Sequence, residues 1–371
     1  MTKEFIIEAK KLKNIVLFNP EIGHNGSTST ENSIFLKVEN QKLLFEILSF
    51  RYILTGYETI DSTISTEMIL PLKRLQDIIR SFADDVKLLF KEKDNTTISV
   101  EANSITFNIK TCEQEQRNQI DTNKGEEYSI SKNELLDGIK KVKIAMGDDE
   151  VRYYLNGIHI EIYKDNDNLY HPFLVATNGH VLATFGDKKD EWQFVHKAIM
   201  PKKVISEIIK ILERTENNVL ISFNKSNMNI KSDNLEILIK LIEADFPDYN
   251  KVIPYNNSKE ITIETSALKD AVEKVSIVSN DKNKNAKLLI ADNNISVEMI
   301  SSDGNSANAN ITTAYTGKQI EVILNAKYLI DVLAQVEEEK IVFKIEDGIS
   351  PLIIQEEQNK KLLVVIMPIR S

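Results

Sequence analysis

The sequence predicts an α+β chain made of three copies of one unit, each with two helices packed on antiparallel sheets. Two observations support this prediction. Strand-to-helix transitions recur near Ile7, Ile130 and Ile263, at intervals of 123 and 133 residues. A second strand that leads into a helix lies about halfway through each interval. Repeats of this length in a chain of 371 residues fit three homologous domains better than one large domain.

Each repeat begins with a short strand of alternating apolar and polar residues, followed by a helical pattern. The three beginnings are Glu4–Leu12, Glu127–Leu135 and Glu260–Leu268. In the second repeat, Leu135, Ile139, Val142 and Met146 recur at spacings of three and four residues, which places them on one face of a helix. We therefore expect a buried helix face directly after the first strand of every repeat.

A second strand and a second helix follow in each repeat. The strand ends are Met68–Pro71, Ala198–Pro201 and Val322–Asn325, and the helices are Leu72–Phe82, Lys202–Arg214 and Ala326–Val336. Pro71 and Pro201 are expected in the first helical turn, where a missing N–H group costs nothing. These elements predict that every repeat has the same two-part construction.

Alternating apolar residues predict a closing strand at the end of each repeat. The three sets are Ile105, Phe107 and Ile109; Ile237, Ile239 and Leu241; and Leu363, Val365 and Met367. Polar linkers without apolar periodicity follow at 118–126 and 254–259. We therefore place the repeats at residues 1–122, 127–253 and 259–371, each with about eight short strands.

The net charge of −10 argues against nucleic acid as a partner if the charges are spread evenly. They are not, because the six helical windows together carry +9 and the rest of the chain carries −19. The helices of the third repeat are neutral, although Lys282, Lys284 and Lys287 lie in the adjoining loop. This pattern predicts a positive helical face that attracts phosphate groups without reading bases.

The composition gives little support to an enzyme, a cofactor or a metal site. The five histidines form no metal-binding spacing, and no glycine-rich phosphate loop occurs in the sequence. Cys112 lies beside Glu113 and Glu115, which we expect to raise the pKa of its thiol. Because there is one cysteine, no signal peptide and no apolar stretch of about 20 residues, we expect a soluble cytoplasmic protein.

Three segments stand apart from the repeat pattern. They are Val151–Gly157, with one cation and two aromatic residues; Phe173–Ala183, which is typical of two strands joined by an Asn-Gly turn; and Phe246–Pro254, rich in aromatic residues and proline. Together with the tail Met367–Ser371, they are expected to meet where the second and third repeats join, because pockets commonly form between domains.

These motifs resemble those of the bacterial sliding clamp family, the beta subunits of DNA polymerase III, in order and spacing over residues 127–371. The resemblance implies a DNA clamp fold in which two chains associate head to tail into a ring of six domains, with helices lining the hole. It also implies a non-catalytic homodimer that encircles double-stranded DNA and tethers the replicative polymerase, the clamp loader and other proteins.

The resemblance also implies three sets of site residues. The partner-peptide pocket would consist of Leu155, Thr177, Gly179, His180, Leu182, Pro247, Val252, Tyr328, Val365, Met367, Pro368 and Arg370. The DNA-binding residues would be Arg152, Tyr153, Tyr154, Lys202 and Lys203. The dimer interface would include Phe107, Ile277 and Val278. The pocket would take a short peptide by leucine and phenylalanine anchors.

Two alternatives remain open. The first repeat departs from the family pattern, with the segment Gly23–Thr30 in place of a basic one. This departure favours a clamp-like scaffold that binds peptides and no longer encircles DNA. The second alternative is a hydrolase built around His180 and nearby carboxylates.

At the pocket rim, Asn178, Val181 and Lys251 replace residues that are usually aspartate, arginine and arginine in the family.

Overall fold

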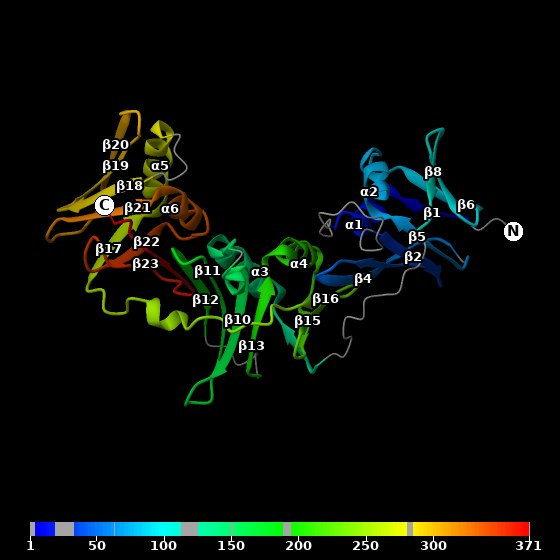
Figure 1. Ribbon diagram of the computed structural model, residues 1–371, viewed down its shortest axis with the longest axis horizontal. Helices are drawn as coiled ribbons and strands as arrows, with labels where there is room; N and C mark the ends of the chain where they lie inside the picture. The colour runs from blue at the N-terminus through cyan, green and yellow to red at the C-terminus, as the bar shows by residue number, and fades with distance from the viewer. Residues whose placement is uncertain are drawn as a thin grey trace. The chain divides into compact units, whose positions relative to one another are not determined.

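The computed structural model describes residues 4–18, 33–62, 64–112, 125–149, 151–187, 194–279 and 285–370. The segment 23–30, Lys282, Lys284, Ser371 and most of the linker 118–126 lie outside these residues. The chain forms two compact units, shown in Figure 1. Unit 1 contains residues 1–134 and 203–241, and unit 2 contains residues 135–202 and 242–371. The repeat boundaries drawn from the sequence stay predictions, since the compact units divide the chain elsewhere.

Unit 1 contains the first repeat and half of the second. Its elements are β1 (Glu4–Glu8), α1 (Ala9–Val16), β2 (Ser33–Glu39), β3 (Lys42–Leu48), β4 (Tyr52–Thr59), β5 (Thr66–Pro71), α2 (Leu72–Arg80), β6 (Lys87–Asp94), β7 (Thr97–Ala102), β8 (Ile105–Lys110), β9 (Glu127–Ile130), α4 (Lys202–Arg214), β14 (Val219–Phe223), β15 (Asn227–Lys231) and β16 (Leu235–Lys240).

Unit 2 contains the other half of the second repeat and the third repeat. Its elements are α3 (Lys132–Val142), η2 (Lys143–Ala145), η3 (Tyr153–Leu155), β10 (Gly157–Lys164), β11 (Tyr170–Thr177), β12 (Val181–Gly186), β13 (His196–Pro201), η4 (Tyr249–Val252), β17 (Lys259–Glu264), α5 (Thr265–Val275), η5 (Ser276–Val278), β18 (Asn285–Ala291), β19 (Asn294–Ile300), β20 (Ser306–Thr312), β21 (Ile320–Asn325), α6 (Ala326–Leu333), β22 (Lys340–Ile345), β23 (Leu352–Glu356) and β24 (Leu362–Ile366).

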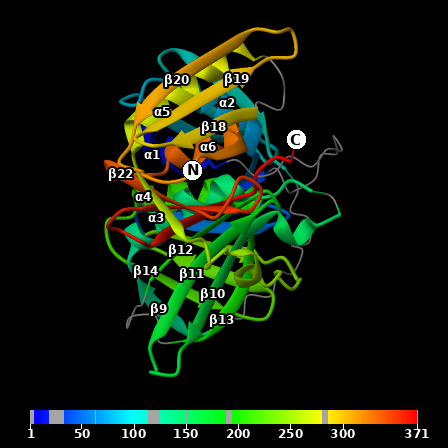
Figure 2. The ribbon, with the colours of Figure 1, turned by 90° about the vertical axis from the view of Figure 1, so that its left-hand side faces the viewer.

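Each unit has one eight-stranded and one four-stranded sheet. In unit 1 the strand orders are β5-β2-β3-β4-β16-β15-β14-β9 and β1-β6-β7-β8. In unit 2 they are β13-β10-β11-β12-β24-β23-β22-β17 and β20-β19-β18-β21. In Figure 2 the strands of this four-stranded sheet are coloured yellow to orange, and β20 lies close to α5. The eight-stranded sheets are continuous across two antiparallel pairs, β4 with β16 and β12 with β24. We call each of these pairs a seam, because it joins two repeats.

The threefold α+β repeat predicted from the sequence is confirmed: eight strands and two α-helices recur three times within the described residues. The predicted position of the prolines is wrong. Pro71 and Pro201 are the last residues of β5 and β13, where they pair with Ser33 and Gly157. Both therefore stand before a helix, and Pro71 is the N-cap residue of α2. In the third repeat, Asn325 takes this place and its side chain accepts backbone hydrogen bonds.

Among the described residues, no helix is long and apolar enough to cross a membrane. Nor do these residues bring together three or more metal-ligating side chains of the His, Cys, Asp and Glu types. The pKa of the Cys112 thiol is raised, as the sequence predicts, but burial is the cause. The two glutamates that the sequence analysis held responsible lie outside the described part of the chain.

Candidate functional site

The loop between β11 and β12 is held by short side chains that bond to its own backbone. Thr177 Oγ1 donates to the carbonyl of Val181 at 2.8 Å. The Asn178 side-chain oxygen accepts from the N–H groups of His180 and Val181, both at 2.9 Å. The Asn-Gly hairpin is confirmed in position, but it is not a two-residue turn, because the last paired residues are 177 and 182. Gly179 supplies the left-handed conformation of the loop, with φ of +89°.

A second loop, residues 147–156, is organised by one carboxylate. Asp149 accepts the backbone N–H groups of Val151 and Arg152, each at 2.8 Å. It also pairs with the Arg152 guanidinium at 2.9 Å. These hydrogen bonds, with those from Arg152 the largest, lower the pKa of Asp149. Asn156 closes the loop by bonding the backbone of Asp149 in both directions. The loop therefore presents Tyr153 on its exposed side.

The two loops lie against each other. A Cβ atom on Gly179 would stand 3.0 Å from a terminal nitrogen of Arg152. The resemblance assigned Arg152 to the DNA-facing set, whereas the structure places its guanidinium beside a loop of the predicted peptide pocket. Gly179 is thus favoured by its backbone conformation, and a side chain there would displace the guanidinium of Arg152 slightly.

The C-terminal tail is anchored to this loop and to the third repeat. The N–H group of Met367 donates to the carbonyl of His180 at 2.9 Å, and that of Ile369 donates to the carbonyl of Ile323 at 2.8 Å. The imidazole of His180 stacks with the ring of Tyr328, with 6.3 Å between centroids and 18° between planes. The β11–β12 loop and the tail therefore meet, as the sequence motifs predict, and α6 lies beside them.

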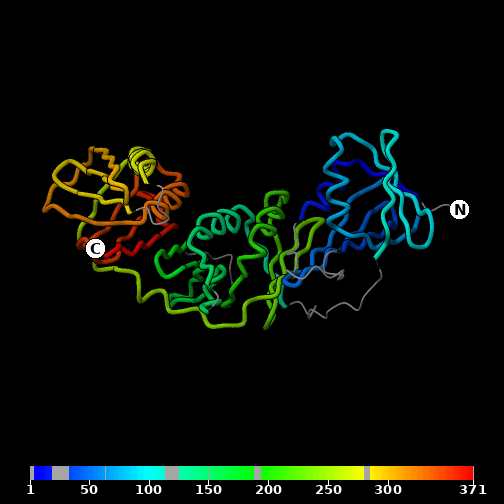
Figure 3. Tube along the Cα trace, turned by 45° about the horizontal axis from the view of Figure 1, so that its top comes forward, coloured from blue at the N-terminus to red at the C-terminus, as the bar shows by residue number. Residues whose placement is uncertain are grey.

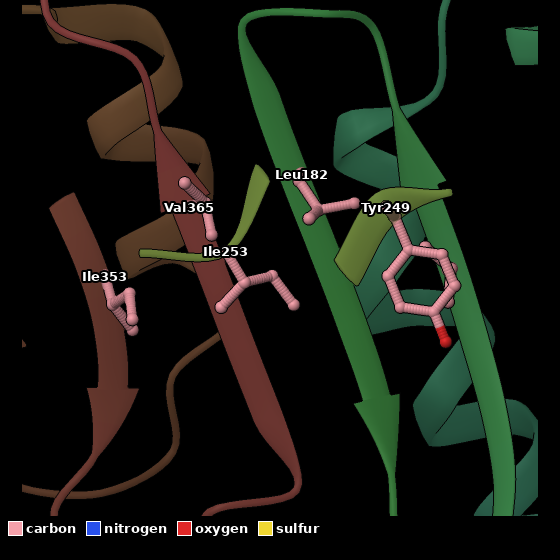
Figure 4. Packing of buried hydrophobic residues seen from close by; sticks show 6 residues of the cluster. Leu182, Tyr249, Ile253, Ile353 and Val365 are labelled. Atoms are coloured by element: carbon pink, nitrogen blue, oxygen red, sulfur yellow. The ribbon is translucent and has the colours of Figure 1, made fainter. Parts of the chain in front are cut away.

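A buried apolar cluster lies across the unit 2 seam, next to the β11–β12 loop and the tail. Its members are Val175, Leu182, Tyr249, Ile253, Ile353 and Val365. Leu182 and Val365 pair directly across the seam. In Figure 4 the side chain of Ile253 lies close to both, and Tyr249 lies on the far side of Leu182. The segment 246–258, which includes η4, is the yellow-green stretch that leads to β17 in Figure 3.

The predicted pocket residues therefore divide into a buried floor and an exposed rim. Leu155, Leu182 and Val365 are buried. Val252 and Met367 are 51% and 43% exposed, while Pro247, His180, Gly179 and Arg370 are exposed and Thr177, Tyr328 and Pro368 are half-buried. Tyr249 and Ile253, which cover the floor, are not among the pocket residues predicted from the sequence. The spacing of Phe246, Tyr249 and Ile253, three and four residues apart, could have indicated that they share one face.

The segment over the seam, residues 246–253, is fixed to the sheet by one aromatic stacking contact and one hydrogen bond. Phe246 stacks on the ring of His159, with 4.6 Å between centroids and 1° between planes. The Tyr249 hydroxyl donates to Glu161 Oε2 at 2.8 Å, and Lys197 approaches the other carboxylate oxygen at 2.6 Å. Burial lowers the pKa of His159 to about 4 against an ordinary value of 6.5, although Glu161 opposes this effect.

The lowered pKa of the buried His159 predicts that the fold is sensitive to acid. The unfolded chain takes up a proton at His159 below pH 6.5, whereas the folded chain does so near pH 4. The contribution of His159 to the free energy of unfolding is therefore fully present above pH 6.5. It falls by about 2 to 3 kcal/mol as the pH drops toward 4. Urea unfolding at pH 7.5 and 4.5 measures the loss. His159→Gln should lose less between the two pH values, and equal losses would contradict the assignment.

Of the predicted DNA-binding residues, Arg152, Tyr153 and Tyr154 belong to the 147–156 loop, and Lys202 contacts it. Tyr153 is half exposed and packs edge to face on Tyr154 at 6.1 Å. Lys202 is half-buried, and its ammonium group donates to the carbonyl of Gly147 at 3.2 Å. Lys203 is exposed at the start of the unit 1 part of α4. Tyr153 and Lys203 are thus accessible to a ligand, while Lys202 supports the loop.

The helical charge count needs one correction. Lys141 of α3, counted toward the positive face, is only 3% exposed. Its ammonium group lies 3.8 Å from Asp137, 3.7 Å from Glu337 and 3.6 Å from the buried Glu356. This lysine therefore neutralises carboxylates of the third repeat and adds nothing to a surface charge.

The predicted dimer residues lie at two sheet edges. Phe107 is on β8, an edge strand of the unit 1 four-stranded sheet, and packs edge to face on Phe82 at 6.0 Å. Ile277 and Val278 belong to η5, which lies against β20, an edge strand of the unit 2 four-stranded sheet. Ile277 is 76% exposed, and Val278 is half-buried.

Comparison with known proteins identifies the family. Two family models match, the central domain of the DNA polymerase III beta subunit over residues 129–248 and its C-terminal domain over residues 250–370. The chain is 26% identical to the beta sliding clamp of Vibrio cholerae, with 99% of this chain and 100% of the relative covered. It is also 26% identical to the beta sliding clamp of Pseudomonas aeruginosa, with 91% and 92% covered.

The fold agrees with this result. The crystal structure of the DNA polymerase III subunit beta from Pseudomonas aeruginosa superposes with a TM-score of 0.88 at 25% identity, and all of both chains is covered. Together the two family models span about two thirds of the sequence, and the superposition covers the remaining first repeat as well. The chain therefore belongs to the family of bacterial DNA polymerase III beta subunits, the beta sliding clamps.

Proposed function

We propose that two copies of this chain close a ring around duplex DNA and hold a replicative polymerase there through the peptide pocket of unit 2. As a beta sliding clamp the chain is a processivity factor and a non-catalytic subunit. The observation that carries the ring is the strand order of the sheets. In both seams the fourth strand of one repeat pairs with the eighth strand of the next, as β4 with β16 and β12 with β24.

The same rule leaves one strand unused at each end. The fourth strand of the third repeat is β20, and the eighth strand of the first repeat is β8, and both are edge strands. A second copy supplies the missing partner for each edge. Two copies then form two further seams related by a twofold axis, and no edge remains open at these positions.

Residue burial supports this pairing and predicts its register. At the two seams, Leu54 pairs with Ile237 and Ala183 pairs with Val364, and all four side chains are fully buried. The equivalent residues at the open edges are Ala307 on β20 and Phe107 on β8, and both are half-buried. Phe107 opposite Ala307 pairs a large residue with a small one, and together they can fill the space that the paired side chains fill at each of the two formed seams. We therefore place Phe107 of one copy opposite Ala307 of the other.

Exposed basic side chains on the helices support the DNA part of the proposal. They include Lys10, Lys73, Arg74, Arg80, Lys143 and Lys203. Contacts of such side chains with phosphate groups are independent of sequence and exchange readily, which lets a protein slide along a duplex. A closed ring needs no tight binding, because topology keeps it on the DNA.

Retention on circular DNA tests the ring. Protein loaded on a nicked plasmid should remain bound through gel filtration in high salt, because salt weakens phosphate contacts but does not open a ring. Cutting the plasmid once should release the protein from the ends. Equal retention on the circular and the linear DNA would favour the alternative of a scaffold that does not encircle DNA.

Deletion of residues 367–371 tests the pocket. The deletion removes the exposed Met367 side chain and its backbone bond to His180. We expect the affinity for a fluorescent peptide with leucine and phenylalanine anchors to fall about 30-fold, or about 2 kcal/mol. Fluorescence anisotropy gives the affinity, and light scattering should show an unchanged dimer. A chain that lacks Ser371 alone is the matched control, and unchanged affinity after the full deletion would refute the pocket.

A further inference from the structure

The loop between β3 and β4 in unit 1 has the same backbone structure as the loop between β11 and β12 in unit 2. In unit 1 the N–H group of Ser49 donates to the carbonyl of Tyr52 at 2.9 Å. In unit 2 the N–H group of Asn178 donates to the carbonyl of Val181 at 3.3 Å. Four residues follow the last paired residue of the first strand in each loop. The two loops therefore correspond residue by residue.

A second backbone hydrogen bond joins each loop to the chain on the other side of its seam. In unit 1 the N–H group of Lys240 donates to the carbonyl of Arg51 at 2.8 Å. In unit 2 the N–H group of Met367 donates to the carbonyl of His180 at 2.9 Å. Arg51 thus stands where the predicted peptide pocket has His180, and Lys240 stands where it has Met367. Two cations replace two rim residues of that pocket.

The sheet beside the loop is apolar in unit 1 as it is in unit 2. Ile53 and Leu238 pair across the unit 1 seam, at the position of the pair Leu182 and Val365 in unit 2. Leu238 is buried, and Ile53 is half-buried. Lys240 follows Leu238 by two residues on β16, so both side chains lie on one face of the sheet. The two cations therefore border an apolar floor.

The two cations also meet at an exposed aromatic ring. The side chain of Phe50 belongs to the same loop and is 58% exposed. The guanidinium carbon of Arg51 lies 5.6 Å from the centre of this ring, and Nζ of Lys240 lies 6.0 Å from it. Aromatic rings attract cations through the negative charge on their faces. Phe50 thereby holds together two like charges that repel each other.

Neither cation has a carboxylate partner among the residues that the structure describes. Within the same residues, the buried Nε atom of Arg51 has no hydrogen-bond acceptor. Other lysines of unit 1 are neutralised locally, as Lys37 is by Glu39 at 2.6 Å. Two neighbouring cations without a counter-ion favour an anionic ligand, because hydrogen bonds between charged groups are the strong ones.

We propose that Phe50, Arg51, Ile53 and Lys240 form a second binding site, which takes an acidic segment of a partner protein. We call it the cationic site. A carboxylate of the segment pairs with Arg51 and Lys240, and a neighbouring apolar side chain packs on Phe50 and Ile53. The site goes beyond the proposed function, and it rests on that function only through its likeness to the peptide pocket.

The observations favour a peptide over a nucleic acid at the cationic site. The corresponding place in unit 2 is the predicted peptide pocket, and both places have an apolar floor at a seam. The net charge of the chain is −10, which repels a long polyanion more than a short acidic segment. The two seams of one chain thus select different segments, one apolar and one acidic.

The test compares two fluorescent peptides with blocked ends, Gly-Asp-Phe-Asp-Gly and Gly-Asn-Phe-Asn-Gly, titrated with the full-length protein. We expect the acidic peptide to bind about 10-fold more tightly, because its carboxylates form charge-assisted hydrogen bonds. Arg51→Gln together with Lys240→Gln should abolish this preference. Lys318→Gln together with Lys360→Gln removes the same charge at exposed positions and should leave the preference intact.

Single changes keep the test valid if the double variant fails to fold. Lys240 is exposed, and Lys240→Gln alone should reduce the preference to about 3-fold. Phe50→Tyr retains the ring and should bind like the natural chain, whereas Phe50→Ser should weaken binding of the acidic peptide. Thermal unfolding should be the same for all three variants, since both side chains are exposed.

Each outcome decides the proposal. Equal affinity for both peptides, a preference that survives the Arg51 and Lys240 changes, or no binding at millimolar protein overturns it. Loss of the preference in the control pair shows general charge attraction and overturns it too. Tighter binding of single-stranded oligothymidylate through Arg51 and Lys240 would assign the site to nucleic acid. The chain without residues 367–371 should still bind the acidic peptide, which separates this test from that of the unit 2 pocket.

Discussion

Replacement of Ile277 by aspartate should convert the dimer into a monomer of 42.3 kDa. The equivalent residue of the second repeat, Ile144 of η2, is half-buried, and η2 lies against β12 at a formed seam. Ile277 is 76% exposed beside the open edge of β20. If a second copy covers this edge, a carboxylate at 277 is removed from water without a partner. We expect the dimer dissociation constant to rise about 1,000-fold, or about 4 kcal/mol.

Sedimentation equilibrium measures this change. Ile349→Asp is the matched control, because Ile349 is 68% exposed and lies in the turn between β22 and β23. The control should keep the dimer, and its thermal unfolding should match that of the Ile277 variant at concentrations where both are monomeric. A stable Ile277→Asp dimer would refute the assignment of this edge to the interface.

Replacement of Lys141 by methionine should destabilise the folded chain by about 3 to 5 kcal/mol. The change removes the cation that lies among Asp137, Glu337 and Glu356. Burial raises the pKa of Asp137, and Lys141 opposes that effect. Without the lysine the neighbouring carboxylates repel one another, and the pKa of Asp137 rises further, so that Asp137 gains its proton at higher pH. The variant should therefore recover part of its stability as the pH falls from 7 toward 5, opposite to the trend from His159.

The third repeat supplies a matched control for this change. Lys274 corresponds to Lys141 and pairs with Asp270 as Lys141 does with Asp137, but Lys274 is 69% exposed. Lys274→Met should cost less than about 0.5 kcal/mol in the free energy of unfolding. Adding Glu356→Gln to Lys141→Met should restore part of the loss. Equal effects of the two lysine changes in urea unfolding would contradict a buried role for Lys141.

The repeat could be predicted from the sequence because its signals are local. The predicted helix Lys202–Arg214 agrees with α4 at both ends, since an amphipathic period of 3.6 residues is complete within a single helix. The ends of α2 and α6 were predicted too late, because polar or small residues there leave the period undefined. Strand positions were likewise readable, as with Ile105, Phe107 and Ile109 on β8.

What could not be predicted depends on contacts between distant residues. Strand β1 lies at the start of its repeat but pairs with β6, which comes from the second half of that repeat. No sequence pattern indicates this pairing. Lys141 has the spacing of a surface residue, and its burial depends on Glu356, which is contributed by the third repeat. The division of the pocket residues into floor and rim depends on Tyr249 and Ile253, which cover the seam from a separate segment.

The sheets also determine where a ring of this kind can come apart. Within one chain the paired strands of a seam are parts of the same molecule, so the broken pair re-forms at a high effective concentration that dilution does not change. In unit 2 the segment with Tyr249 and Ile253 adds apolar packing across the break. A seam between copies lacks this covalent tether. Opening and reclosure should therefore take place where β8 meets β20, leaving each chain's own seams intact.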